Sequence, residues 1–169
     1  MDNSKPSDVE MFRKRLEEAA EYNEIWDVVK DTVKHTTNMH RRGMMLFLDD
    51  LPIRLGAYHP IGTNNIVLNR TLVHIVENAA KSKRVVNALI YNLLLHEYLH
   101  ALGQLSEVKV RQMVYEISKN CFSEYSTAAK IAKESPWSLL KGIPLEIKNP
   151  PKRVMEIVRS FEKSDKYIV

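Results

Sequence analysis

The spacing of hydrophobic and polar residues changes from one segment of this chain to the next. Apolar residues recur at helical intervals between Val9 and Val33, and Ser7 with Glu10 has the form of a capping box at a helix start. We therefore expect one long helix from Ser7 to about His35, with its apolar stripe packed against a sheet. Short apolar or alternating runs bounded by Gly, Pro and Asn predict three strands, at 44–48, 53–58 and 65–69.

The stretch 85–102 is apolar almost all round, which is typical of a helix buried in a core. Ser82 is a suitable N-cap for it, and Gly103 suits the residue just past its end. Further helices are predicted at 71–80, 107–121 (capped by Ser106), 124–133 and 151–163. The pattern indicates one α+β domain over 1–169. The three predicted strands follow the long helix, and the part of the chain after the buried helix is mainly helical.

Composition narrows the class of protein. The chain has 169 residues, 44% hydrophobic and 27% charged, which are ordinary values for a folded domain. The net charge of +4 is spread over scattered clusters with no interleaved aromatic residues, so we do not expect nucleic-acid binding. Asn87 and Asn92 make the apolar helix a poor membrane span. The start of the chain has no apolar secretion signal, and the single cysteine, Cys121, is expected in the core, so a cytoplasmic protein is predicted.

The segment His96-Glu97-Tyr98-Leu99-His100 carries the strongest chemical signal. Residues four apart lie on one face of a helix, so His96 and His100 can share one metal ion. Glu97 projects beside them, where it can take a proton from a metal-bound water. Two histidines and a glutamate in a buried helix need polar partners, and a metal supplies them. In the competing interpretation the histidines bond backbone carbonyls in the core and Glu97 is exposed.

With this motif in place, the chain resembles the zincin-type metallopeptidases. The predicted order of long helix, short strands, HExxH helix and later helices is similar over nearly the whole length. The resemblance implies an upper half, about 1–103, with a long backing helix, a small mixed sheet of about three strands and the HExxH helix, and a helical lower half, about 104–169. The segments Gly56-Ala57-Tyr58-His59-Pro60 and Asn65-Ile66-Val67-Leu68-Asn69 resemble the edge-strand region of small single-domain zincins, including the ImmA/IrrE type. The resemblance implies a peptide or protein substrate extended along an edge strand, here near Ile66 to Leu68.

A catalytic zinc site needs a third protein ligand and leaves one position for water. The segment 96–106 resembles the metzincin motif through Gly103, but it departs from that motif at Ser106, where metzincins have His or Asp. Glu107 follows at once and shares the apolar stripe of its predicted helix, so it ranks first as the third ligand. Glu116 lies on a more polar face, but gluzincins also take a glutamate from a helix after HExxH, so it ranks second, and Glu124 ranks third. Glu107 also suits a helix N-terminus by charge alone, which is a serious alternative.

The sequence thus predicts a Zn²⁺-dependent metallopeptidase with Glu97 as catalytic base and His96, His100 and Glu107 as metal ligands. The alternative is a regulatory protein with a closed, structural zinc site that recruits a fourth ligand. A latent enzyme, covered by 143–151 or 166–169, is a variant of the first. Five further residues are weaker candidates as ligands or as donors to the transition state, and ordinary structural roles are favoured for them: His59, His74, Tyr98, Tyr115 and Tyr125.

Overall fold

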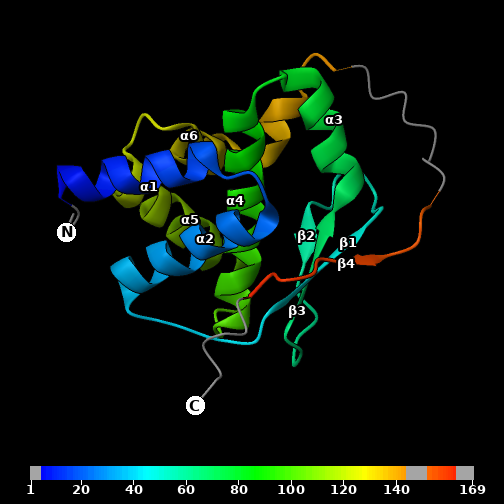
Figure 1. Ribbon diagram of the computed structural model, residues 1–169, viewed down its shortest axis with the longest axis horizontal. Helices are drawn as coiled ribbons and strands as arrows, with labels where there is room; N and C mark the ends of the chain where they lie inside the picture. Colours follow the sequence, from blue (N-terminus) through cyan, green and yellow to red (C-terminus); the bar gives the residue numbers. More distant parts are fainter. Residues whose placement is uncertain (1–4, 144–151, 163–169) are drawn as a thin grey trace.

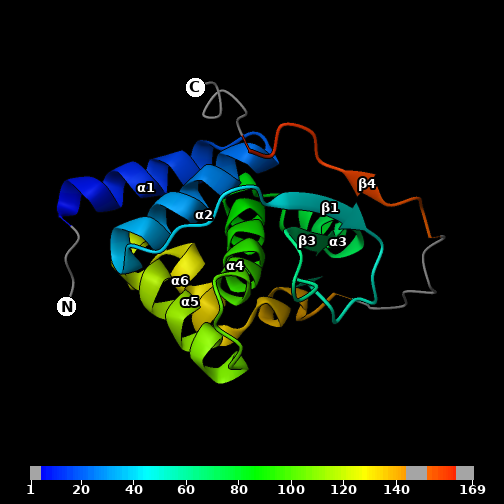
Figure 2. The same ribbon diagram turned by 90° about the horizontal axis from the view of Figure 1, so that it is seen from below.

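Helix α4 (Lys83–Ala101) lies at the centre of the molecule and carries the HExxH motif (Figure 1). The computed structural model describes residues 5–143 and 152–162. Within them the fold is α+β, as predicted, with helices on one side of α4 and a small mixed sheet on the other (Figure 2). The remaining elements are α1 (Pro6–Glu18), α2 (Tyr22–Thr37), β1 (Met45–Asp49), β2 (Ala57–Tyr58), β3 (Asn65–Asn69), α3 (Arg70–Ala80), α5 (Glu107–Phe122), α6 (Thr127–Glu134), the 3₁₀ helix η1 (Pro136–Leu140) and β4 (Glu156–Ile157).

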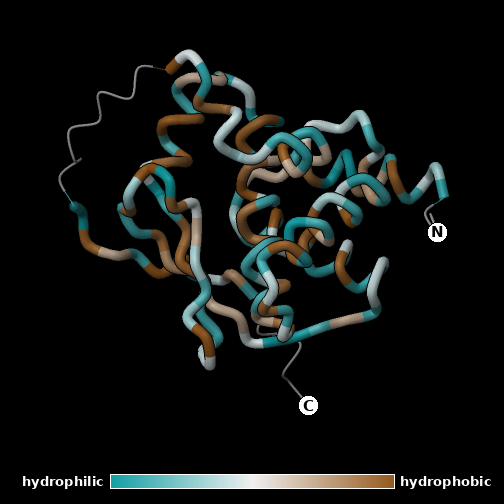
Figure 3. Tube along the Cα trace, turned by 180° about the vertical axis from the view of Figure 1, so that it is seen from behind, coloured by the Kyte–Doolittle hydropathy of each residue, from teal (hydrophilic) through white to brown (hydrophobic). Residues whose placement is uncertain are grey.

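The ends of α4 follow the predicted signals. The Ser82 hydroxyl accepts a hydrogen bond from the backbone N–H of Val85, so it caps the helix start. Gly103 has φ +104°, a conformation that glycine adopts at little cost, and it turns the chain just beyond the helix. Most of the side chains between are buried. Figure 3 shows brown and teal stretches alternating along the other helices, as expected where only one face is covered.

The predicted long N-terminal helix is in fact two helices, and this prediction was wrong. Asn87 of α4 donates through Nδ2 to the carbonyls of Leu16 and Ala19, at 2.8 and 2.9 Å, so it satisfies acceptors that a continuing helix would use. Glu24 then accepts the Ala20 N–H at 3.2 Å at the start of α2. The break between the two helices depends on Asn87, which is 68 residues from Ala19 in the sequence. The sequence at the break contains no Gly or Pro that would predict it.

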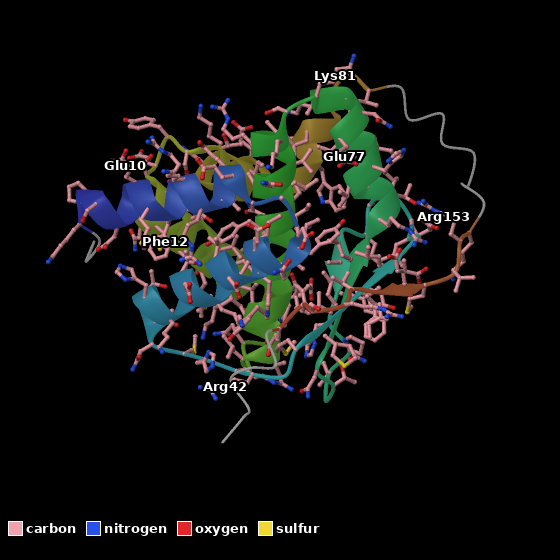
Figure 4. The ribbon with its side chains drawn as sticks, viewed as in Figure 1. Glu10, Phe12, Arg42, Glu77, Lys81 and Arg153 are labelled. Atoms are coloured by element: carbon pink, nitrogen blue, oxygen red, sulfur yellow. The ribbon has the colours of Figure 1, made fainter. Side chains whose placement is uncertain are left out.

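Helices α1 and α2 pack mainly against other helices, whereas the sequence predicted packing against the sheet. They contact each other, α4 and α5, and α4 stands between them and most of the sheet. Phe12 of α1 makes edge contacts with the rings of His35 and Phe122 (Figure 4). Cys121 is buried in this core, as predicted. The N-cap is Lys5 rather than Ser7, because Asp8 accepts the Lys5 N–H.

The sheet has the order β2-β3-β1-β4. β1 and β3 are parallel, while β2 and β4 pair antiparallel at the two edges. β3 has the predicted bounds, but of the predicted strand 53–58 only Ala57–Tyr58 forms. The buried Asn69 side chain donates to the carbonyls of Leu51, Pro52 and Leu55, so these residues form a turn instead.

The predicted helix 151–163 does not form in its described part, 152–162, which contains β4 and then turns at 159–162. Phe161 stacks on Trp26 with ring centroids 4.7 Å apart. Glu162 accepts from the indole N–H of Trp26 and from the Gly43 N–H, at 3.2 and 2.7 Å. These long-range contacts outweigh the local helical pattern. Of the segments 143–151 and 166–169, considered above as covers for the site, only Ile143 belongs to the described residues.

The buried carboxylate of Asp50 links the segment before β4 to the end of β1. Asp50, directly after β1, accepts hydrogen bonds from the guanidinium groups of Arg70 and Arg153 and from the hydroxyl of Thr71 (Figure 4 labels Arg153). Its side chain is 3% exposed. The two arginines hold the pKa of Asp50 well below its ordinary value, although burial opposes them. Among the described residues, no helix is long and apolar enough to cross a bilayer.

Candidate metal centre

The structure places His96 and His100 on one face of α4, as the spacing predicted. Their Nε2 atoms lie 3.3 Å apart. The Nδ1 atom of His100 lies 2.7 Å from the carbonyl oxygen of Gln104, in the turn after the helix. A proton on Nδ1 donated to that carbonyl leaves the Nε2 lone pair directed toward His96, which is how metal-binding histidines are commonly oriented.

Glu107 completes this group from the first turn of α5. Its Oε2 lies 3.1 Å from His96 Nε2, and its Oε1 lies 2.7 Å from His100 Nε2. The turn at Gly103 brings the start of α5 back over the end of α4, and the Ser106 hydroxyl caps α5 through the Lys109 N–H. One ligand atom from each of the three residues lies within 4.8 Å of the others.

The alternatives for the third ligand lie elsewhere. Glu116 is exposed further along α5, and Glu124 is exposed in the loop before α6. Within the described residues, neither belongs to a group of three that could hold a metal; the structure assembles His96, His100 and Glu107. Glu107 also occupies the first turn of α5, where a negative charge is favourable, so both interpretations of its position are compatible.

The donor set has the chemistry of a divalent metal site. Two imidazole nitrogens and a carboxylate oxygen are the usual protein ligands of zinc. At these separations three acceptor atoms need positive charge between them, either as shared protons or as a cation. One ion can satisfy all three lone pairs at once, so the residues present fit a zinc ion with room for a further ligand.

Electrostatics sets Glu97 apart from Glu107. Burial raises the pKa of Glu97 to about 8, the charge of Glu107 adds to this, and a hydrogen bond from the His59 N–H opposes it. Burial also lowers the pKa of His96, with Glu107 acting in the opposite direction. For Glu107, burial by itself favours the neutral acid, but His96 and His100 together outweigh it and lower the pKa. Glu97 is therefore a buried carboxyl with a raised pKa beside three side chains that could hold a metal ion.

The weaker candidates have other partners. His59 Nδ1 lies 2.8 Å from the carbonyl of Asn65, and His74 is exposed beside Glu77 on α3. The hydroxyl of the fully buried Tyr98 accepts the Arg41 N–H and donates to the Arg41 carbonyl, so it holds the segment before β1. Tyr115 and Tyr125 lie outside the cavity wall described next.

A cavity of about 620 Å³ opens beside the cluster and is lined by His96, Glu97 and Glu107. Gly56 and Ala57, at the edge of the sheet, form part of its wall. The expected docking edge near 66–68 was wrong, because β3 is paired on both sides and these residues are buried. The open edge next to the cavity is β2, which is only two residues long.

The sequence did not single out several other residues in the cavity wall. Trp137 of η1, Leu93 of α4 and Val114 of α5 are apolar, and their local patterns are those of ordinary core positions. The basic residues are Arg54, Arg111 and Lys133, which come from a loop, α5 and α6. They are far apart in sequence, so only the tertiary fold reveals that they share one wall.

Comparisons of this chain with protein-family models, with curated proteins and with solved structures found no match. The function is therefore argued from the chemistry of the site alone.

Proposed function

We propose that the protein is a zinc-dependent metallopeptidase whose metal ligands are His96, His100 and Glu107 and whose general base is Glu97. The observation that carries the proposal is the convergence of these ligands at the wall of a cavity that Glu97 also lines. A zinc ion bound there would act as a Lewis acid toward a substrate carbonyl and toward water.

The chain's own residues account for the remaining parts of the chemistry. A zinc ion bound nearby would favour the ionised form of Glu97 and so bring its raised pKa back toward neutrality, where the carboxylate can take a proton from an attacking water and return it to the leaving amine. His100 is oriented by the Gln104 carbonyl, and the edge at Ala57 offers an extended substrate a strand to lie along.

The openness of the cluster favours catalysis over a structural zinc site. A structural site has four protein ligands, whereas the described residues supply three. His59 and His74, the residues considered for a fourth position, are engaged with Asn65 and Glu77. A zinc ion held by these residues would lie at the cavity, because His96 and Glu107 line its wall, and water and substrate could reach it from there.

Zinc analysis and a cleavage assay on one set of variants test this proposal. Purified protein should bind about one zinc per chain, and a mixture of unstructured peptides should be cleaved in a chelator-sensitive way. Glu97→Gln should retain zinc but lose at least about a hundredfold in kcat/KM, since a positioned general base contributes this much. His100→Ala should lose the zinc itself.

His74→Ala is the matched control, because this exposed histidine lies on α3 away from the cluster. It should keep both zinc and cleavage. Protein that stays metal-free in excess zinc refutes the metal site. Full activity in Glu97→Gln refutes the assigned mechanism.

A further inference from the structure

Three cations line the cavity beside the metal cluster without an ion-pair partner. Arg54, Arg111 and Lys133 take part in none of the salt bridges found among residues 5–143 and 152–162. All three are exposed residues of separate segments. The fold thus gathers three like charges at one wall, where together they attract a group of opposite charge.

The two carboxylates of the same wall do not neutralise these cations. Neither carboxylate forms a salt bridge with Arg54, Arg111 or Lys133 among the described residues, and Glu107 lies against His96 and His100 instead. Three cations against two carboxylates leave the wall with a net positive charge. A bound zinc ion would add two further positive charges. The cavity is therefore a positive pocket with apolar side walls from Leu93, Val114 and Trp137.

We propose that this cavity selects substrates by a carboxylate close to the scissile bond, held by Arg54, Arg111 and Lys133. The inference rests on the proposed peptidase function and names its substrate class. The carboxylate belongs either to an acidic side chain or to the peptide C-terminus, since both present the same group. Guanidinium groups suit a carboxylate because they can donate two parallel hydrogen bonds.

Asn92, in the same wall, could instead favour a substrate with a glutamine side chain, and the experiment below distinguishes this preference from one for a carboxylate. This 3% exposed residue lies in the same wall, and its amide NH₂ donates to the carbonyls of Ala88 and Ala128. Its Oδ1 has no partner among the described residues. An acceptor deep in the wall favours a donor such as a glutamine amide, whereas the cations favour glutamate. Matched Glu and Gln peptides therefore distinguish the two.

The test uses the zinc-loaded full chain and peptides that differ at one position near the cleaved bond. Each position receives Glu, Gln or Lys in turn, and a second set compares C-terminal carboxylate with C-terminal amide. In the first set, Glu should raise kcat/KM at least about fivefold over Gln at one position. If the recognised group is the C-terminus, the free carboxylate should instead show this advantage over the amide in the second set. The preference should shrink between about 0.05 and 0.5 M salt.

Variants assign the preference to the cavity wall. Arg111→Gln should lower cleavage of the acidic peptide while leaving the neutral peptide within about twofold, and Arg54→Gln and Lys133→Gln should act in the same direction. Lys109→Gln removes an exposed charge from α5 outside the wall and should leave the preference intact. Cleavage with no charge preference, or with Gln favoured over Glu, overturns the inference and leaves the peptidase proposal standing.

A binding measurement keeps the two proposals separate. Fluorescence anisotropy of labelled peptides on the Glu97→Gln protein reports affinity without turnover. Tighter binding of the acidic peptide, lost in Arg111→Gln, supports the carboxylate pocket. Equal binding of acidic and neutral peptides overturns it. Absence of cleavage by the wild-type protein, with zinc bound, is a failure of the peptidase proposal alone.

Discussion

Glu97 should weaken the fold of the metal-free protein at neutral pH. Its side chain is buried, and burial raises its pKa from an ordinary value of 4.5 to about 8. Between these two values the folded state holds a proton that the unfolded state has released. Stability therefore falls as the pH rises through this interval, because the unfolded state binds fewer protons. Glu97→Gln removes the titration and should be more stable than the wild type at pH 7.

The size of the effect follows from the two pKa values. Each pH unit in which the folded state is protonated and the unfolded state is not costs about 1.4 kcal/mol. From pH 4.5 to pH 7 the accumulated cost is about 3 kcal/mol, which is a large fraction of the stability of a small domain. The advantage of Glu97→Gln should vanish near pH 4, where both states of the wild type carry the proton.

Urea unfolding in the presence of a chelator measures this difference. The free energy of unfolding of both proteins is determined at about pH 4.5, 6 and 7, and only the difference between them is interpreted, since other groups titrate in the same range. Glu116→Gln, which changes an exposed glutamate of α5, controls for the loss of one charge. It should shift stability by less than about 0.5 kcal/mol at every pH.

A pH-independent difference between Glu97→Gln and wild type would refute the reasoning, because it would place the carboxyl in an environment like water. Zinc supplies a second check. A bound cation favours the carboxylate, so saturating zinc should reduce the advantage of the variant at pH 7.

Two further predictions concern the scaffold of the site. Asp50→Asn should destabilise the protein by about 3 kcal/mol at pH 7, since it leaves Arg70 without its buried partner. The lowered pKa of Asp50 makes this contribution complete above about pH 4 and progressively lost below it, which urea unfolding at pH 7 and pH 3 would show. Gly103→Ala should cost about 1 to 2 kcal/mol through its positive φ and weaken zinc binding, because this turn directs Glu107 to the cluster. Gly62→Ala also has a positive φ with no atom within 4 Å of the added Cβ, so it should cost similar stability without changing the zinc affinity measured by competition with a chelator.

The sequence alone determined the elements whose signals are local. The all-round apolar pattern of 85–102, the caps at Ser82 and Ser106 and the glycine at 103 give α4 and the start of α5 close to their observed bounds. The i, i+4 spacing brings two imidazoles together in any helix, so the pairing of His96 with His100 needs no tertiary information. The position of Glu107 just after the Gly103 turn favours it as the third ligand, but its expected place on the buried stripe is wrong, since its side chain is 58% exposed.

Tertiary structure decided what depends on partners distant in the chain. Asn87 donates hydrogen bonds to the carbonyls at the end of α1, and Asn69 holds 51–55 in a turn. Phe161 and Glu162 contact Trp26, so the segment around them does not form the helix that its pattern predicts. Periodicity reports a residue's preference for a face, but it carries no information on which distant group supplies a hydrogen bond or a stacking surface. For the same reason the cations of the cavity wall, contributed by a loop and two helices, become a common surface only once the chain is folded.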